Sequence, residues 1–535
     1  MAKLLADATG LEGKTVLLRT CYDVPIDVSK PKLDPARVSD DSRILDSIPT
    51  LKFLIERKAR IILEPGWCGR PKGEDAELSM ACVANRLSEQ LKKEGLLQYP
   101  VLMAPNALDG SKPRSVYKNK NEVIVAAQAV KPGQVLVLEN SRFDAEENAA
   151  DDGFGAFLAS LVDGWSLYVN EAEAQNHRPC ASVTVTPLKI AEQGGDAVLG
   201  MHFAKAAEYI GGIGKALRAP NRGKFVFFLT GKKIETAPGI TSKITVASNL
   251  LDLMAQGDVM VVQGAIAYTF LLADMQKDGL AKNSEAISLF ISEYNAKIKQ
   301  ASSDAKKSKE PGAAEAAAKA IDGLEREKSA KILGLLGIDE KQCKIFVGNS
   351  YVDYKQLGEQ LYFAHSLIAK AESKKVQLVT GVDHIITDQL PNKSGQLPAN
   401  AKVQVFSKPL GIPAGFLGVA PGPATISAIS AAVNGAAIVL VAGPLAIEDA
   451  NIEQKYGVHK HVFDAIAKAK EAGAITVAAG GDTAATVARV NSKAAFSIVS
   501  NAGGATLELI EKGTSPGIEA VEKANKIAAA KKQSA

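Results

Sequence analysis

The sequence predicts a doubly wound α/β fold in more than one domain. Short apolar runs alternate with amphipathic helical stretches through the first third of the chain, which is typical of a parallel sheet covered by helices. At 535 residues the chain is too long for a single hydrophobic core. In such sheets ligands bind in the loops just past the carboxyl ends of the strands, so the candidate site residues are sought there.

The first third carries this pattern in chain order. Apolar runs predict buried strands at residues 15–19, 60–63, 135–138, 167–169 and 182–185. Residues 42–56 predict a helix with one apolar face, made by Ile44, Leu45, Ile48, Leu51 and Leu54. A second helical stretch covers residues 79–93. Together these elements predict a doubly wound domain at the start of the chain.

Composition and charge argue against several functional classes. Hydrophobic residues make up 46% of the chain and charged residues 23%, as in ordinary globular proteins. The net charge is only +4, with Lys and Arg scattered along the chain, so we expect no nucleic-acid partner. The uncharged stretch 415–447 is interrupted by prolines and glycines, so we expect no membrane span.

Cysteine usage and the chain ends favour a cytoplasmic protein. Five cysteines, an odd number in a long chain, do not make a disulfide framework and favour a reducing compartment. Residues 1–7 lack the apolar core of a signal peptide, and the last three residues are not a peroxisomal signal. We expect a cytoplasmic monomer or a component of a larger assembly, with cytoskeletal association left open.

Four arginines follow or flank the predicted strands of the first domain: Arg43, Arg70, Arg142 and Arg178. A single arginine is usually a solvated surface charge. Four arginines from separate segments at one edge of a sheet indicate an anion, because like charges converge only where an anion compensates them.

The stretch 475–486 predicts a phosphate site. An apolar run is followed by Gly480 and Gly481, and then Asp482 and Thr483 open an alanine-rich helix. Free N–H groups and the positive end of a helix dipole attract an anion, and Asp482 could hold a Mg²⁺ that bridges it. The alternative is an ordinary strand-to-helix connection with Asp or Thr as the N-cap.

Motifs from the whole chain are found in one order: Asp40-Asp41-Ser42-Arg43-Ile44, Gly69-Arg70-Pro71-Lys72-Gly73, Glu139-Asn140-Ser141-Arg142-Phe143, Gly264-Ala265-Ile266-Ala267-Tyr268-Thr269-Phe270, Gly443-Pro444, Gly480-Gly481-Asp482-Thr483 and Gly503-Gly504-Ala505-Thr506. In these motifs the chain resembles the phosphoglycerate kinase family. The resemblance implies two Rossmann-like parallel-sheet domains joined by a helix. Glycerate would bind the N-terminal domain and nucleotide the other, and domain closure would allow phosphoryl transfer between an acyl phosphate and ADP.

The resemblance also implies domain limits. The glycerate-side domain would span residues 1–195, the connecting helix 196–212 and the nucleotide-binding domain 213–514. The tail, 515–535, would return to the first domain. Residues from about 278 to 370 leave the family pattern, and we interpret them as an insertion. It is either a solvated surface feature or an arm that binds a protein partner.

Site roles follow from the same resemblance. Arg43 and Lys233 would be catalytic, as the transition-state arginine and the phosphate lysine. Substrate, 3-phosphoglycerate or another small anion, would be bound by Asp23, Arg70, Arg142 and Arg178. ADP or ATP with Mg²⁺ would be bound by Gly231, Lys243, Asp449, Gly480, Gly481, Thr483, Gly503 and Gly504, with Asp482 as the metal ligand. Lys243 is displaced from the family position by inserted residues, and Asp449 would substitute for the family's ribose-binding glutamate.

Several positions depart from the family pattern. Where the family has Asp-Phe-Asn this chain has Cys21-Tyr22-Asp23, and Trp67 and Cys180 replace two histidines. On the nucleotide side the substitutions are at Gln263, Ala420, Ala442, Asn501 and Ala502. Trp67 is far larger than a histidine and is expected to fill the glycerate pocket.

These departures decide the expected function. Losing two or three charged hydrogen bonds, at about 1.5–3 kcal/mol each, weakens transition-state binding by about 3–9 kcal/mol, or about two to six decades in rate. We therefore expect impaired or lost catalysis, a pseudoenzyme with a binding or structural role. The alternative is an active glycolytic phosphoglycerate kinase.

A further hypothesis concerns Cys21, Cys68 and Cys180, which fall in loops that converge in the family fold, near His177. They could form a thiol or soft-metal site. The alternative is drift of released catalytic positions to small apolar residues.

Overall fold

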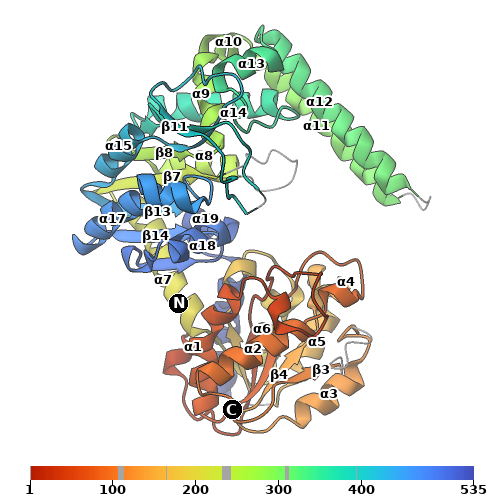
Figure 1. The fold of residues 1–535 in the computed structure, drawn as a ribbon. Coiled ribbons are helices and arrows are strands. Elements are labelled where there is room, and N and C mark those ends of the chain that lie inside the picture. Colours follow the sequence, from red (N-terminus) through yellow and green to blue (C-terminus); the bar gives the residue numbers. More distant parts are fainter. Residues whose placement is uncertain are drawn as a thin grey trace. The chain divides into compact units, whose positions relative to one another are not determined.

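The computed structural model describes residues 2–105, 114–163, 166–231, 243–307, 312–392 and 394–534. The chain divides into two compact units (Figure 1). Unit 1 comprises residues 1–212 and 508–535, and unit 2 comprises residues 213–507. Helix α7 (Met201–Leu217) contains the division between them.

Unit 1 is built on a parallel six-stranded sheet. Its strand order is β3-β4-β2-β1-β5-β6, so the order of the strands reverses between β1 and β5 and the doubly wound topology is confirmed. The strands are β1 (Thr15–Arg19), β2 (Arg60–Glu64), β3 (Leu102–Ala104), β4 (Val135–Leu138), β5 (Leu167–Asn170) and β6 (Asp196–Leu199).

Helices cover this sheet because alternate strand residues on each face are apolar. Val16 and Leu18 of β1 share one core cluster with Ile44 and Leu51 of α1 (Ser42–Glu56) and with Leu87 of α2 (Ala81–Lys93). The remaining helices of this unit are α3 (Lys120–Gln128), α4 (Ala145–Asn148), α5 (Asp152–Ala159), α6 (Thr186–Glu192) and the C-terminal α20 (Pro516–Ser534).

Helix α20 is tied to the edge of the unit 1 sheet. The Asn525 amide donates to the Ala197 carbonyl (2.6 Å) and to the Asp196 carboxylate (2.9 Å), both in β6. The Gly517 N–H donates to the Asn176 carbonyl (3.2 Å). Because a bare edge strand exposes unpaired backbone groups, this helix also protects β6.

Unit 2 contains a second parallel six-stranded sheet and a small antiparallel one. The large sheet has the order β15-β14-β13-β7-β8-β9, formed by β7 (Lys224–Thr230), β8 (Val259–Gln263), β9 (Gln377–Val379), β13 (Ala436–Ala442), β14 (Ile475–Ala479) and β15 (Ile498–Ser500). The small sheet contains β10 (His384–Thr387), β11 (Val403–Phe406) and β12 (Leu417–Pro421). Two parallel sheets confirm the predicted α/β class.

The helices that pack on these sheets are α8 (Lys243–Leu253), α9 (Ile266–Met275), α14 (Leu357–Ser373), α15 (Pro423–Val433), α16 (Ala450–Tyr456), α17 (Val458–Glu471), α18 (Gly481–Arg489) and α19 (Gly504–Lys512). Helices α10 (Lys277–Lys282) and α13 (Glu340–Val347) flank a long pair, α11 (Ser284–Lys307) and α12 (Ala313–Leu335). This pair extends side by side away from the sheets of unit 2 (Figure 1).

The strand predicted at 182–185 is wrong. Residues Ala181–Val185 form a π-helical turn that leads into α6. Alternating β-branched residues favoured a strand, but side chains satisfy the backbone in the helical form. Glu147 accepts the Ser182 N–H (2.9 Å), and the Tyr168 hydroxyl donates to the Ser182 carbonyl (2.9 Å).

The predicted start of the connecting helix at 196 is also wrong. Residues 196–199 form strand β6, and the helix begins at Met201. The break falls at Gly200, where a Cβ would overlap the Glu171 carboxylate. That carboxylate accepts the N–H groups of His202 (2.9 Å) and Phe203 (3.3 Å), so a side chain of the β5 loop satisfies the first turn of α7.

No helix within the described part of the chain is long and apolar enough to cross a membrane. Residues 278–370, predicted as an insertion, contain helices α11, α12 and α13 and most of α10 and α14. A protein partner for this segment stays a prediction.

A buried lysine joins three of these helices. Lys328 of α12 has no exposed surface, and its Nζ lies 2.6 Å from Glu359 Oε2 of α14 and 3.1 Å from Glu325 Oε2. It also donates to the Asn295 side chain of α11 (3.0 Å). The charge is therefore paired and hydrogen-bonded, as burial requires.

We expect Lys328→Ala to destabilise unit 2 by about 3–5 kcal/mol, because it leaves two buried carboxylates without their counter-charge. Urea unfolding measures the loss. Lys319→Ala, which removes an exposed lysine from the same helix, is the matched control and should change the free energy of unfolding by less than about 0.5 kcal/mol. Equal effects of the two variants would contradict the interpretation.

Candidate functional site

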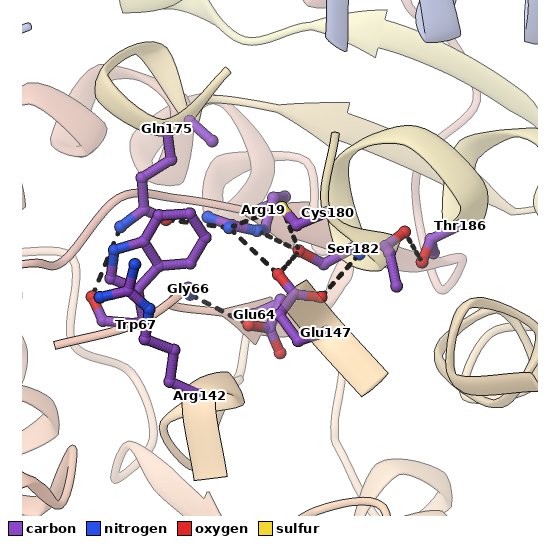
Figure 2. Close-up of polar contacts among 12 residues, drawn as sticks. Arg19, Glu64, Gly66, Trp67, Arg142, Glu147, Gln175, Cys180, Ser182 and Thr186 are labelled. Carbon is purple, nitrogen blue, oxygen red and sulfur yellow. Dashed lines mark hydrogen bonds and ion pairs between the residues drawn. The ribbon is translucent and has the colours of Figure 1, made fainter. Parts of the chain in front are cut away.

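A network of buried polar groups surrounds the Arg19 guanidinium at the carboxyl end of β1 (Figure 2). Arg19 has no exposed surface, and it donates to Ser182 Oγ (2.7 Å) and Gln175 Oε1 (2.9 Å). Glu147 supplies the opposite charge, with Oε1 3.6 Å from Arg19 Nη2. The same carboxylate accepts the Ser182 hydroxyl (2.6 Å). Because the buried charge is paired and hydrogen-bonded, the network fixes the loops around it.

Glu64, the last residue of β2, lies beside this network and is also fully buried. Its carboxylate accepts the Gly66 N–H (3.0 Å). Burial raises the pKa of Glu64 to about 8, a rise that the charge of Arg19 opposes and that of Glu147 supports. Glu64 therefore holds a proton through much of the neutral range.

The predicted anion-binding arginines share contacts with the loop after β2. Asp23 Oδ1 accepts the Gly69 N–H (3.0 Å), and Arg142 Nη1 donates to the Gly69 carbonyl (2.5 Å). Arg43 Nη1 lies 3.9 Å from Asp23 Oδ2 and donates to the Asp23 carbonyl. The structure thus brings Asp23, Arg43 and Arg142 together.

Arg70 and Arg178 are close enough to affect Arg142. Burial lowers the pKa of Arg142, and the positive charges of Arg178 and Arg70 lower it further, opposed by Asp23. Arg70 and Arg178 are exposed, while Arg43 and Arg142 are partly buried. We call Arg43, Arg70, Arg142 and Arg178 the arginine cluster. Such a concentration of like charge favours an anionic ligand.

Trp67 packs against the buried side of the arginine cluster. Its side chain is 3% exposed and belongs to an apolar group with Ala172, Cys180 and Val183. The Arg142 guanidinium lies 4.3 Å from the centre of the indole ring, and Figure 2 shows the two side chains face to face. The indole therefore presents an apolar aromatic surface to the Arg142 guanidinium.

The three cysteines of the predicted thiol site are buried. Burial raises the pKa of the Cys21, Cys68 and Cys180 thiols, that of Cys68 to about 12, so all three are protonated at neutral pH. Within the described ranges no group of three His, Cys, Asp or Glu side chains could hold a metal ion. The soft-metal hypothesis gains no support from these residues.

The glycine turn after β14 begins a helix. Gly480 has φ 102°, a conformation that favours glycine, and precedes α18, which begins at Gly481 with no side-chain cap in the described structure. Its first-turn N–H groups are thus available to an anion. Thr483 is buried, where its hydroxyl accepts the Gly443 N–H (2.8 Å) and donates to the Ala479 carbonyl (2.8 Å).

A cavity of about 580 Å³ in unit 2 is lined by the loops at the carboxyl ends of β7, β8 and β13 and by the first turn of α18. This volume lies in the range typical of small-molecule sites. The polar lining includes Gln263, Tyr268, His384, Glu448 and Asp482. Gly231 also lines it, and a Cβ on neighbouring Gly264 would lie 2.8 Å from the Gly231 nitrogen, so the two loops meet as bare backbone.

Asp482 is suited to a metal ion that bridges phosphates. Its carboxylate is exposed at the cavity wall, and no described residue donates a hydrogen bond to it. Carboxylates with open coordination positions bind Mg²⁺ together with substrate phosphates. The other predicted glycines lie close by, because Gly503 Cα would lie 3.7 Å from a Cβ on Gly480, and Gly504 begins α19.

Asp449 is placed differently from the prediction. Its side chain is 3% exposed and accepts the N–H groups of Ile452 (2.9 Å) and Leu397 (2.8 Å), so it caps α16. The adjacent Glu448 lines the cavity and pairs with Arg489 (3.0 Å). Of these two adjacent acidic residues, Glu448 therefore lines the cavity and Asp449 does not.

Two predicted lysines cannot be placed. Lys233 lies outside the described residues, and Lys243 is the first residue of α8, with its side chain also outside them.

The sequence analysis missed Arg19, Glu64 and Glu147 as site-forming residues. The available signal was a charged residue at the end of two buried strands, Arg19 in β1 and Glu64 in β2.

The model of the phosphoglycerate kinase family matches residues 5–328 and 340–513. The chain belongs to the phosphoglycerate kinase family. Phosphoglycerate kinase from Anaeromyxobacter sp. (strain Fw109-5) is 30% identical over 526 residues, covering 98% of this chain and 100% of the relative. That from Chlorobium phaeobacteroides is also 30% identical, with 97% and 99% coverage.

Solved structures agree on the family fold. Phosphoglycerate kinase from Coxiella burnetii has a TM-score of 0.61 at 24% identity, covering 98% of this chain and 100% of that one. The Pyrococcus horikoshii enzyme has a TM-score of 0.63 at 19% identity, with 99% and 100% coverage. The predicted family membership is therefore confirmed, whereas the predicted loss of catalysis finds no support in these comparisons.

We expect Glu64→Gln to reduce the loss of stability with rising pH. Because the pKa of Glu64 is higher in the folded protein than the ordinary value of about 4.5, its protonated form stabilises the fold below pH 4.5 and this contribution is lost towards pH 8. Glutamine stays neutral throughout. Urea unfolding at pH 5, 6.5 and 8 measures the slope, with exposed Glu56→Gln as control. A slope identical to that of the parent would refute this.

We expect Glu448→Ala and Asp449→Ala to act on different properties. Loss of the cap should make Asp449→Ala less stable by about 0.5–2 kcal/mol with little change in Mg·ADP affinity. Glu448→Ala should weaken Mg·ADP binding about tenfold, the effect of losing one charged hydrogen bond. Thermal unfolding and calorimetry separate the two effects. The reverse assignment would restore Asp449 as the nucleotide-binding acid.

Proposed function

We propose that this chain catalyses phosphoryl transfer between 1,3-bisphosphoglycerate and ADP, forming 3-phosphoglycerate and ATP. The observation that carries the proposal is the arginine cluster in unit 1. Of its two partly buried members, Arg43 lies 3.9 Å from the Asp23 carboxylate, and the charge of the same carboxylate acts to raise the pKa of Arg142. The identity of about 30% to phosphoglycerate kinases over their full lengths supports the same reaction.

The acid would bind through guanidinium groups. Arg70, Arg142 and Arg178 would hold its phosphate and carboxylate charges, since arginine binds both in a bidentate manner. Arg43 would stabilise the charge on the phosphoryl group in transfer. Asp23 holds the Arg43 guanidinium near the Gly69 loop.

The nucleotide would bind in the cavity of unit 2. Its phosphates would accept N–H groups from the first turn of α18, as anions do at helix N-termini. Asp482 would bind the Mg²⁺, whose charge neutralises the phosphates during transfer. Lys233 and Lys243 would contact the phosphates, as the family resemblance implies. The localisation expected for such an enzyme is the cytoplasm.

A second candidate is a binding protein with impaired catalysis. Trp67 and Cys21 motivate it, because both are nearly fully buried and neither is a strong hydrogen-bond donor to the acid, as the family's polar side chains would be. Asp23 also adds a negative charge next to Arg43. This candidate keeps ADP and anion binding but predicts slow transfer.

A coupled assay of ATP formation from 1,3-bisphosphoglycerate and Mg·ADP separates the two candidates. We expect turnover in the ordinary range of about 1–10³ per second. We also expect Arg43→Ala to lower kcat by about 10²–10³, the effect of removing a preorganised donor to transition-state charge. ADP affinity, measured by calorimetry, should not change.

Arg57→Ala is the matched control, because Arg57 lies just after the same helix α1 and packs on Phe53 instead of facing the cluster. Its turnover should equal that of the parent. Absence of ATP formation by correctly folded parent protein that binds both ligands would favour the binding protein. Equal losses in the two arginine variants would show that Arg43 has no special role.

A further inference from the structure

Trp67 is surrounded by guanidinium groups. The Arg142 carbon Cζ lies 4.3 Å from the centre of the indole ring, and those of Arg19 and Arg178 lie at 5.7 and 5.8 Å. All three distances are within the range of cation–π attraction. The ring itself is nearly fully buried, so its faces are available to these side chains and not to solvent.

The three arginines differ in how their charge is balanced. Arg19 is paired with Glu147. Within the described ranges Arg142 and Arg178 form no ion pair; Arg142 donates to the Gly69 carbonyl, and Arg178 donates to the His177 ring (3.3 Å). Two guanidinium groups without an ion pair in the described ranges therefore lie near one aromatic ring, which attracts both while they repel each other.

Buried side chains of unit 1 hold the backbone that carries the indole. The Trp67 carbonyl accepts the Gln175 amide (3.4 Å), and Gln175 is held in turn by buried Arg19 (2.9 Å). The preceding Gly66 has φ 74°, and a Cβ there would lie 2.3 Å from Gln175 Oε1, so only glycine fits. The backbone on both sides of the ring is thus fixed by the buried network.

We propose that Trp67 is a positioning residue whose buried indole holds Arg142 and Arg178 ready for a small phosphorylated carboxylate. In this arrangement the aromatic ring takes over the place of the family's imidazole and makes no hydrogen bond to the ligand, so the guanidinium groups alone recognise it. The inference rests on the proposed function, which supplies 3-phosphoglycerate as the probe.

Binding of 3-phosphoglycerate tests this directly. The chain has two tryptophans, so Trp165→Phe leaves Trp67 as the only indole. Its emission should change saturably as 3-phosphoglycerate binds, since Arg142 and Arg178 then exchange part of their contact with the ring for the anion. Calorimetry on full-length variants should give Trp67→Phe a Kd within about threefold of the parent and Trp67→Leu a Kd raised by about 3- to 30-fold.

In the ATP-forming assay run in reverse, Trp67→Leu should raise the KM for 3-phosphoglycerate and leave the KM for Mg·ATP unchanged, which general loss of folding would not do. Val83→Ala, a truncation in the core of unit 1 on α2, is the control for loss of packing. Its 3-phosphoglycerate affinity should match that of the parent.

Three results would overturn the inference. They are unchanged or tighter 3-phosphoglycerate binding by Trp67→Leu, an unchanged emission of Trp67 at saturation, and no binding by the parent. The emission test uses an intact Trp67 and so holds even if Trp67→Leu does not fold. Failure of the proposed function is distinct: binding as expected without ATP formation would leave the role of Trp67 intact.

Discussion

The buried charge of Arg19 is the constraint on which the unit 1 site depends. A guanidinium without water must be paired and hydrogen-bonded, and Glu147, Ser182 and Gln175 do this from three separate segments. Residues Ala181–Val185 form a π-helical turn in place of the strand that the sequence predicts. In this turn the Ser182 N–H donates to Glu147, the carboxylate that is paired with Arg19. The positions of the loops at this site therefore follow from the burial of the Arg19 guanidinium.

The side chains around this network also stabilise the arginine cluster against repulsion between its positive charges. Gln175 joins Arg19 to the Trp67 carbonyl, which fixes the indole next to Arg142. Asp23 plays the corresponding part for Arg43 and connects it to the Gly69 loop. Trp67 and Asp23 thus serve as internal partners of the arginines.

In unit 2, glycines bring backbone segments close to one another around the cavity. Gly231 and Gly264 approach as bare backbone, Gly480 allows the turn before α18, and Thr483 joins that turn to Gly443. Two acidic residues of unit 2 differ in burial. Asp482 is exposed at the cavity, whereas Asp449 is buried and accepts a backbone N–H group with each of its carboxylate oxygens.

The sequence by itself determined the α/β class, the family, the strands that begin both sheets and the segments that carry the arginine cluster and the glycine turns. These follow from periodicity and from short motifs, which are local. Only the tertiary structure decided that residues 182–185 are helical, that β6 precedes α7, that Glu448 faces the cavity, and that Trp67 lies among three guanidinium groups. Each of these depends on partners distant in sequence, such as Glu147 for Ser182 and Glu171 for His202, and burial of their charges outweighs local propensity.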